Sequence, residues 1–129
     1  MEPAFLELAE ILLIHQDQLE QYGGSPGVRD IGILQSATAM PRAGIADRYL
    51  HEDIFEMAAA YLFFIVQDHP FVDGNKRTGA VAAMVFLALN DIGIQVDEDG
   101  LEAMVRSVAE GTTTKADVAM FFRSGQAQP

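Results

Sequence analysis

Residues 69–79 read His-Pro-Phe-Val-Asp-Gly-Asn-Lys-Arg-Thr-Gly and join two apolar segments. The preceding segment, Glu52–Asp68, has apolar residues at helical spacing, and Pro70 disfavours helical geometry for the residue before it. The following segment is apolar on every side from Ala80 to Leu89. The rest of the chain must enclose a helix of that kind, so we expect residues 74–92 to form the central buried helix.

Further amphipathic helices are expected around this centre. Pro3 suits the first turn of a helix that ends where Gly23 and Gly24 interrupt the pattern at Tyr22. The apolar residues of this first helix are Phe5, Leu8, Ala9, Leu12, Leu13 and Leu19. The complete set of expected helices is 3–22, 30–39, 52–68, 74–92, 97–111 and 114–122.

The expected fold is therefore all-α, a compact domain of about six helices with residues 69–79 and the apolar helix at its core. Residues 42–50 are expected to be a loop, and the extended piece 92–96 has no partner strand, so no sheet is predicted. A length of 129 residues fits a single domain spanning 1–129. Residues 124–129 are expected to be a frayed tail.

The composition excludes several kinds of function. The chain has 19 acidic and 8 basic residues, a formal charge of −11. Direct nucleic-acid binding is not expected, because it depends on Lys and Arg neutralising phosphates. The absence of cysteine excludes disulfides, thiolate zinc sites and a cysteine nucleophile.

No membrane association is expected. The longest uncharged run, Thr78–Asn90, is shorter than the roughly 20 residues of a membrane-spanning helix. Glu2 stands where a signal peptide would carry positive charge. We therefore expect the protein to be cytoplasmic.

Residues 69–77 combine groups suited to phosphate chemistry. The first N–H groups of a helix have no internal acceptor, so Gly74, Asn75 and Lys76 present an anion site at the helix start. Because Gly74 has no Cβ, a phosphate can approach the backbone closely. Lys76 and Arg77 point about 100° apart, which favours an extended polyphosphate over a small anion.

Two further residues supply the remaining groups. Asp73 is suited to a magnesium ion that bridges phosphate oxygens. The imidazole of His69 is suited to act as a general base that takes a proton from an attacking hydroxyl. Taken singly, each part has an ordinary structural interpretation: His69 as a structural histidine, residues 73–75 as a turn with a helix cap, and Lys76-Arg77 as a solvated basic pair. Their combination indicates phosphoryl or nucleotidyl transfer.

The segment resembles the Fic motif, His-x-Phe-x-Asp/Glu-Gly-Asn-Gly/Lys-Arg followed by a second Arg three residues later. The matching residues are His69, Phe71, Asp73, Gly74, Asn75 and Arg77. Residues 23–30, with Leu34, Ser36-Ala37 and Pro41, are similar to the N-terminal signature of the Doc (death-on-curing) branch. The resemblance covers about residues 5–123 and implies the all-helical Fic fold.

Two departures from the AMP-transferring majority bear on the activity. Lys76 stands at the position usually held by Gly, and Ala80 replaces the final Arg. Lys76 is typical of the Doc branch, so the resemblance implies a toxin that is a protein kinase. Such a kinase uses ATP and Mg²⁺, transfers the γ-phosphate to a threonine of elongation factor Tu and arrests translation.

The resemblance also implies roles for individual residues. His69 would be the base, Asp73 the magnesium ligand, and Phe71 a core anchor. Asn75, Lys76 and Arg77 would contact phosphate. Separately, residues 23–27 are a candidate target-docking loop that contains Gly24, with Arg29 and Asp30 beside it as further candidates, although a plain helix-to-helix turn explains the same composition equally well.

A separate antitoxin is the implied partner, with its C-terminal segment in an apolar groove. Exposed members of a set of four apolar residues are candidates to line that groove, although the same residues could be core: Phe5, Leu12, Phe63 and Phe64. Self-inhibition is not expected. The nearest match to the inhibitory motif Ser/Thr-x-x-x-Glu-Gly/Asn, Ser107–Gly111, is one residue too short.

Three other functions compete with the kinase. A Fic-type AMP transferase is disfavoured by Lys76 and Ala80. A catalytically idle nucleotide-binding module is disfavoured because no motif residue of the kinase is missing. A metal-dependent phosphohydrolase is disfavoured because Asp68-His69 reverses the order such enzymes use, and neither His15 nor His51 has a recognisable ligand spacing.

Overall fold

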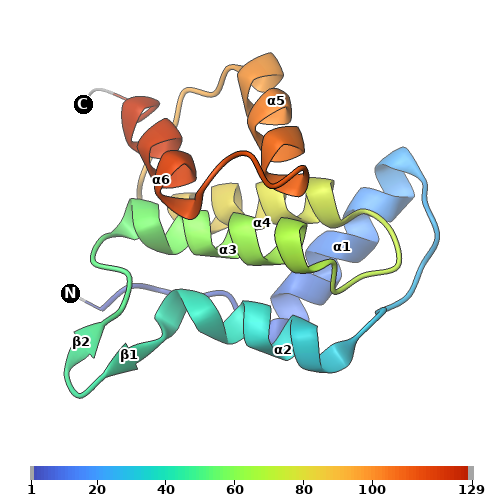
Figure 1. Cartoon of the computed structure of the whole chain (residues 1–129), viewed down its shortest axis with the longest axis horizontal. Helices are drawn as coiled ribbons and strands as arrows, with labels where there is room; N and C mark the ends of the chain where they lie inside the picture. The colour runs from blue at the N-terminus through green and yellow to red at the C-terminus, as the bar shows by residue number, and fades with distance from the viewer. Residues whose placement is uncertain (1, 128–129) are drawn as a thin grey trace.

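The computed structural model describes residues 2–127, which fold into six α-helices, one short 3-10 helix and one two-stranded hairpin (Figure 1). The elements in chain order are α1 (Leu8–Tyr22), α2 (Ile31–Ala39), η1 (Met40–Arg42), β1 (Gly44–Ile45), β2 (Arg48–Tyr49), α3 (Ile54–Asp68), α4 (Asn75–Leu89), α5 (Glu98–Ala109) and α6 (Lys115–Ser124). The helical fold with six helices confirms the prediction from sequence.

Helices α3 and α4 form the centre, with α1 and α2 on one side and α5 and α6 on the other (Figure 1). α4 lies centrally as expected, but α3 is more completely enclosed, because α4 leaves Val85 and Leu89 39% and 48% exposed. The two helices approach closely at Gly79. A Cβ there would lie 2.7 Å from Val66 Cγ2, so a larger residue would force α3 and α4 apart.

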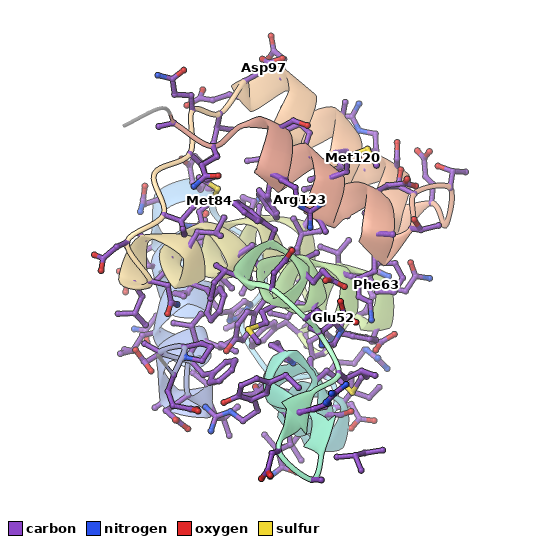
Figure 2. All side chains as sticks on the ribbon, turned by 90° about the vertical axis from the view of Figure 1, so that its left-hand side faces the viewer. Glu52, Phe63, Met84, Asp97, Met120 and Arg123 are labelled. Carbon is purple, nitrogen blue, oxygen red and sulfur yellow. The ribbon has the colours of Figure 1, made fainter. Side chains whose placement is uncertain are left out.

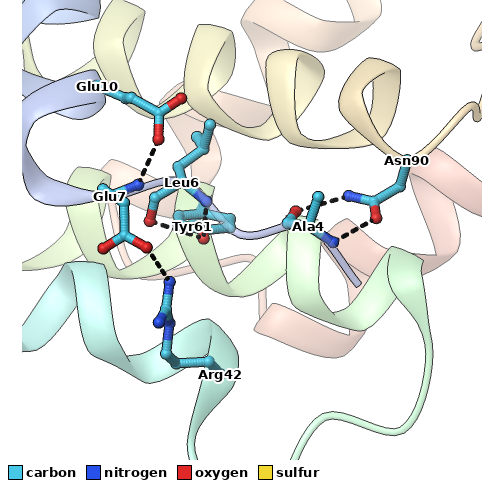
Figure 3. A network of polar contacts seen from close by, with 7 residues as sticks. All are labelled: Ala4, Leu6, Glu7, Glu10, Arg42, Tyr61 and Asn90. Atoms are coloured by element: carbon cyan, nitrogen blue, oxygen red, sulfur yellow. Dashed lines mark hydrogen bonds and ion pairs between the residues drawn. The ribbon is translucent and has the colours of Figure 1, made fainter. Parts of the chain in front are cut away.

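The first helix begins at Leu8 and not at Pro3 as expected, because tertiary hydrogen bonds hold the preceding residues extended (Figure 3). Asn90 bonds both backbone groups of Ala4, at 2.8 and 2.9 Å. The Tyr61 hydroxyl accepts from Leu6 N at 2.9 Å, and burial raises the pKa of Tyr61 to about 12.

The start of α1 is fixed by a reciprocal capping box. Glu7 N donates to Glu10 Oε1 at 2.8 Å, while the Glu7 side chain accepts from the backbone of Glu10. Glu7 also pairs with Arg42 at 3.0 Å. The buried face of α1 differs from the predicted one: Ile11, His15 and Gln18 are buried, whereas Leu12 and Leu13 are exposed.

The prediction that there is no sheet is wrong, because β1 and β2 form a hairpin within the expected loop 42–50. A Cβ on Gly44 would overlap the carbonyl oxygen of Arg48, so this tight pairing requires glycine. The extended piece 92–96 also finds a partner, because Ile94 forms a β-bridge with Gln126.

The chain end is ordered as far as the structure describes it. Gln95 N donates to Gly125 O at 2.7 Å and Ala127 N to Gly93 O at 2.8 Å. Residues 124–127 are therefore held and not frayed, while 128 and 129 lie outside the described residues. Across residues 2–127, no helix is both long enough and apolar enough to cross a bilayer.

α6 is joined to α3 at both ends. Arg123, which lies between these helices in Figure 2, pairs with Asp53 at 2.8 Å. At the other end, Lys115 Nζ lies 2.8 Å from His51 Nε2 and over the Phe64 ring. Because an ammonium only donates, the imidazole of His51 must accept and is therefore neutral.

Stability is expected to fall as the pH drops below about 6.5, the ordinary pKa of histidine. His51 is 2% exposed, and its burial, followed by the charge of Lys115, lowers its pKa in the folded state. The unfolded chain therefore takes up the proton first, and folding loses free energy over that window. Urea unfolding at pH 7.5 and 5.5 measures this loss.

Lys115→Met is the matched variant for this prediction. It removes the neighbouring charge but keeps an apolar stem over Phe64, so the difference between the two pH values should shrink. An unchanged difference would show that Lys115 does not contribute to the pKa of His51. Carboxylates with lowered pKa values, such as Asp53, change the folding stability only at more acidic pH, so they do not contribute to this difference.

Candidate active site

The motif loop, residues 69–74, joins α3 to α4 at one end of the helix pair. α3 ends at Asp68, and His69 follows in the left-handed conformation, φ 51° and ψ 60°. Arg29 stabilises this strained turn, because Nη2 donates to Asp68 O at 2.8 Å and Nε donates to His69 O. The His69 side chain is exposed, as a base for an incoming hydroxyl must be.

Two buried side chains hold the middle of the loop. Phe71 is fully buried and stacks on His15, with the ring centroids 3.7 Å apart. The Asn75 amide accepts from Phe71 N at 3.0 Å and donates to Phe71 O at 2.9 Å. Asn75 is 8% exposed, so its side chain holds the loop, and any phosphate contact from this residue would come from its backbone N–H.

His15 completes this support from α1. Its Nε2 atom lies 2.8 Å from Asp73 O, and its ring is 6% exposed. From the sequence, His15 was weighed only as a metal ligand, and this supporting role was not predicted. Its spacing of four residues from Ile11 and three from Gln18 places it on one helix face with them, which is the signal that could have found it.

Gly74 starts α4 in a left-handed conformation, φ 79° and ψ 14°. The N–H groups of residues 75–77 begin the helix and have no intrahelical acceptor. A cavity of about 250 Å³ opens at this helix end. Its lining residues are His69, Val72, Asp73, Gly74, Asn75, Lys76 and Arg77. The structure thus brings all six predicted catalytic and phosphate-binding residues around one cavity.

The Asp73 carboxylate is exposed but fixed. Oδ2 accepts from Ser25 N at 3.2 Å and Oδ1 from Gly74 N at 2.8 Å. These hydrogen bonds, first from Ser25 and then from Gly74, lower the pKa of Asp73, with a weaker contribution from Arg77. Asp73 is therefore ionised at neutral pH.

A magnesium ion fits this arrangement only together with a phosphate ligand. Within residues 2–127, no group of three or more His, Cys, Asp or Glu side chains could hold a metal. Magnesium commonly binds one or two carboxylates with substrate phosphates and water. One fixed carboxylate beside a helix N-terminus meets that requirement.

Lys76 and Arg77 differ in their surroundings. Lys76 is exposed, and it lines the cavity at the motif. Arg77 Nη2 donates to Gly23 O at 2.8 Å, and its guanidinium carbon lies 5.5 Å from the centre of the Tyr22 ring. The side chain of Arg77 is thus held against the end of α1.

The predicted docking loop, residues 23–27, and the adjacent residues 28–30 pair with the motif loop through their backbone. Val72 N donates to Gly27 O at 3.0 Å, and Arg29 N donates to Pro70 O at 2.7 Å. Asp30 caps α2 by accepting from Ile33 N at 3.0 Å. Arg29 and Asp30 therefore have structural partners, and the backbone pairing gives this loop a fixed place beside the motif.

A larger groove, about 480 Å³, lies between α1, α4 and α5. Its lining residues are Gln18, Tyr22, Lys76, Arg77, Ala80, Val81, Glu98, Leu101, Glu102, Val105 and Arg106. The candidates named from sequence, Phe5, Leu12, Phe63 and Phe64, are absent from this lining. One side of the groove comes from α1, which lies far from α4 and α5 in the chain, so no local pattern indicates it.

Comparison with known proteins agrees with this fold and site. The Fic/DOC family model matches residues 5–87. "Protein kinase doc" of Escherichia phage P1 is 33% identical over 115 residues, covering 88% of this chain and 89% of that protein. "Toxin Doc" of Mycolicibacterium smegmatis is 38% identical over 78 residues, 60% of each chain. The chain belongs to the Fic/Doc family, and these relatives place it in the Doc branch.

Proposed function

We propose that this protein is the toxin of a toxin–antitoxin pair and acts as a protein kinase. The observation that carries the proposal is the cavity at the start of α4, where His69, Asp73 and Lys76 meet unpaired helix N–H groups. Lys76 and Ala80 favour this activity over AMP transfer. The similarity to a protein named as a kinase supports the same reading.

In the proposed reaction, ATP lies with its γ-phosphate toward the target hydroxyl. His69 takes the proton of that hydroxyl as its oxygen attacks phosphorus, and ADP leaves. Lys76, Arg77 and the N–H groups of residues 75–77 stabilise the phosphate charge. Asp73 would hold Mg²⁺, which neutralises phosphate charge when it is bound.

The proposed target is a threonine of elongation factor Tu, whose modification would arrest translation in the cytoplasm. Residues 23–27, with Arg29 and Asp30 beside them, are the proposed docking edge, and Gly24, Arg29 and Asp30 fix its shape. Exposed apolar side chains flank the motif there: Val28 is 38% exposed, Ile31 53% and Val72 55%. Exposed apolar side chains of this kind beside the motif suit contact with a protein substrate.

The proposed partner is a cognate antitoxin whose C-terminal segment occupies the groove between α1, α4 and α5. The groove offers apolar contacts at Val81, Leu101 and Val105 and reaches Lys76 and Arg77 at the motif. A segment bound there would lie against the two phosphate-binding cations, so antitoxin binding would oppose nucleotide binding.

Transfer from labelled ATP tests the proposed activity. The purified protein is incubated with Mg²⁺, elongation factor Tu and ATP labelled on the α- or the γ-phosphate. We expect label to appear on the factor only from the γ position. Label from the α position would instead establish an AMP transferase, and nucleotide binding without transfer would leave an idle binding module for this target.

A further inference from the structure

We propose that the α1 turn, defined as residues 22–25, positions the two charged groups of the motif and keeps them apart. In this proposal Tyr22 is a positioning residue for Arg77, and Gly24 and Ser25 position Asp73. The inference that these groups bind a polyphosphate and Mg²⁺ rests on the proposed function.

The contacts of Arg77 are the first part of the argument. Gly23 O, which follows the last residue of α1, lies at the negative end of that helix and accepts from Arg77 Nη2. Tyr22 lies under the guanidinium, although its own side chain is 65% exposed. Among residues 2–127, Arg77 Nε is buried without an acceptor. Gly23 O takes one of the four N–H groups on the two terminal nitrogens of Arg77, which leaves the others for an anion.

The contacts of Asp73 are the second part. Ser25 N holds one carboxylate oxygen at 3.2 Å. Gly24 has φ +123°, and a Cβ there would lie 3.0 Å from Asp73 Oδ2 and 2.9 Å from Leu19 Cδ2. The turn can reach the carboxylate only because Gly24 has no side chain.

The spacing of Asp73 and Arg77 shows why such a turn matters. Asp73 lies just before the N-cap of α4 and Arg77 lies in its first turn, and the charge of Arg77 reaches the carboxylate, since it contributes to the lowered pKa of Asp73. Within the described part of the chain, no ion pair joins Asp73 and Arg77. The α1 turn supplies each with a different partner, so the carboxylate is left for a metal and the guanidinium for phosphate.

A double-mutant cycle tests the role of Tyr22. Calorimetry measures Mg-ATP binding by wild type, Tyr22→Ala, Arg77→Ala and the double variant. We expect Tyr22→Ala to weaken binding about two- to fivefold, the usual strength of an exposed cation–π contact. Tyr22→Phe keeps the ring and should restore binding. In the Arg77→Ala background, Tyr22→Ala should have no further effect.

The same cycle can overturn the proposal. If Tyr22→Ala weakened Mg-ATP binding equally with and without Arg77, the ring would not act through Arg77. If Tyr22→Ala did not weaken binding at all, Tyr22 would not be a positioning residue. Tyr22 is exposed, so its variants should fold. The Arg77 Nε–H signal in a ¹⁵N NMR spectrum gives a second readout without ligand, because Tyr22→Ala should remove the ring-current shift of that proton.

Gly24→Ala tests the contact with Asp73, and Gly111→Ala is its matched control. Both glycines have positive φ, +123° and +82°, but nothing lies within 4 Å of a Cβ at Gly111. Both variants should lose thermal stability. Only Gly24→Ala should also weaken the affinity for Mg²⁺ in the presence of ATP. We expect a loss of about 10- to 100-fold, the usual cost of disturbing a group that orients a metal ligand. Equal Mg²⁺ dependence in both variants would overturn this part.

These binding measurements separate the inference from the proposed kinase. Coupling between Tyr22 and Arg77 in a protein that transfers no phosphate would support the α1 turn and count against the kinase. A protein that transfers γ-phosphate but shows no coupling between Tyr22 and Arg77 would support the kinase and count against the α1 turn. Failure to bind Mg-ATP at all would overturn both.

Discussion

His69→Asn is expected to lower phosphoryl transfer by about 10²–10⁴-fold, the usual contribution of a positioned general base. His69 is exposed beside the motif cavity, and no other histidine lines that cavity. Asparagine tolerates the left-handed backbone at this position better than alanine does, so the loop should keep its shape. Rates of γ-phosphate transfer at saturating ATP measure the effect.

Two controls make this result specific. Gln67→Ala changes an exposed residue in the last turn of α3 and should transfer phosphate at the wild-type rate. Thermal unfolding of His69→Asn should match the wild type, and Mg-ATP binding should persist. A His69→Asn variant that is fully active and still arrests growth would refute the assigned base.

The helix pattern was predictable from sequence wherever local chemistry decides it. Asp30 caps α2 as expected, and Thr114 with Asp117 forms the expected capping box at α6. Gly74 as the start of the central helix was also predictable, since a loop precedes it and an apolar run follows. In each case the decisive groups are within a few residues of one another.

Features that depend on distant contacts were not predictable. The start of α1 depends on Asn90 and Tyr61, and the ordered chain end depends on pairing with residues 93–95. The residues within 69–77 that were predicted to act in catalysis or phosphate binding do line one cavity. Their supporting groups, His15 and the α1 turn, come from much earlier in the chain. The spacing of His15 indicates that it lies on the buried face of α1, but nothing local shows which loop it supports.

Asn75→Ala is expected to lower the free energy of unfolding by about 2–5 kcal/mol. The side chain is buried, and it satisfies both backbone groups of Phe71. Its removal leaves a buried N–H and a buried C=O unpaired, each at a cost of about 1–3 kcal/mol. Chemical denaturation measures the loss, and Lys76→Ala, at the next and exposed position, should stay close to wild type.

Asn75→Asp separates support of the loop from direct phosphate binding. An ionised aspartate can accept from Phe71 N but cannot donate to Phe71 O, so the variant should be destabilised at pH 7. Protonation restores the donor, and its stability relative to wild type should therefore rise as the pH falls toward 4. If Asn75→Ala instead lost nucleotide binding with its stability unchanged, the amide would contact phosphate directly, and Phe71 would have to be held in place by its packing in the core and on His15.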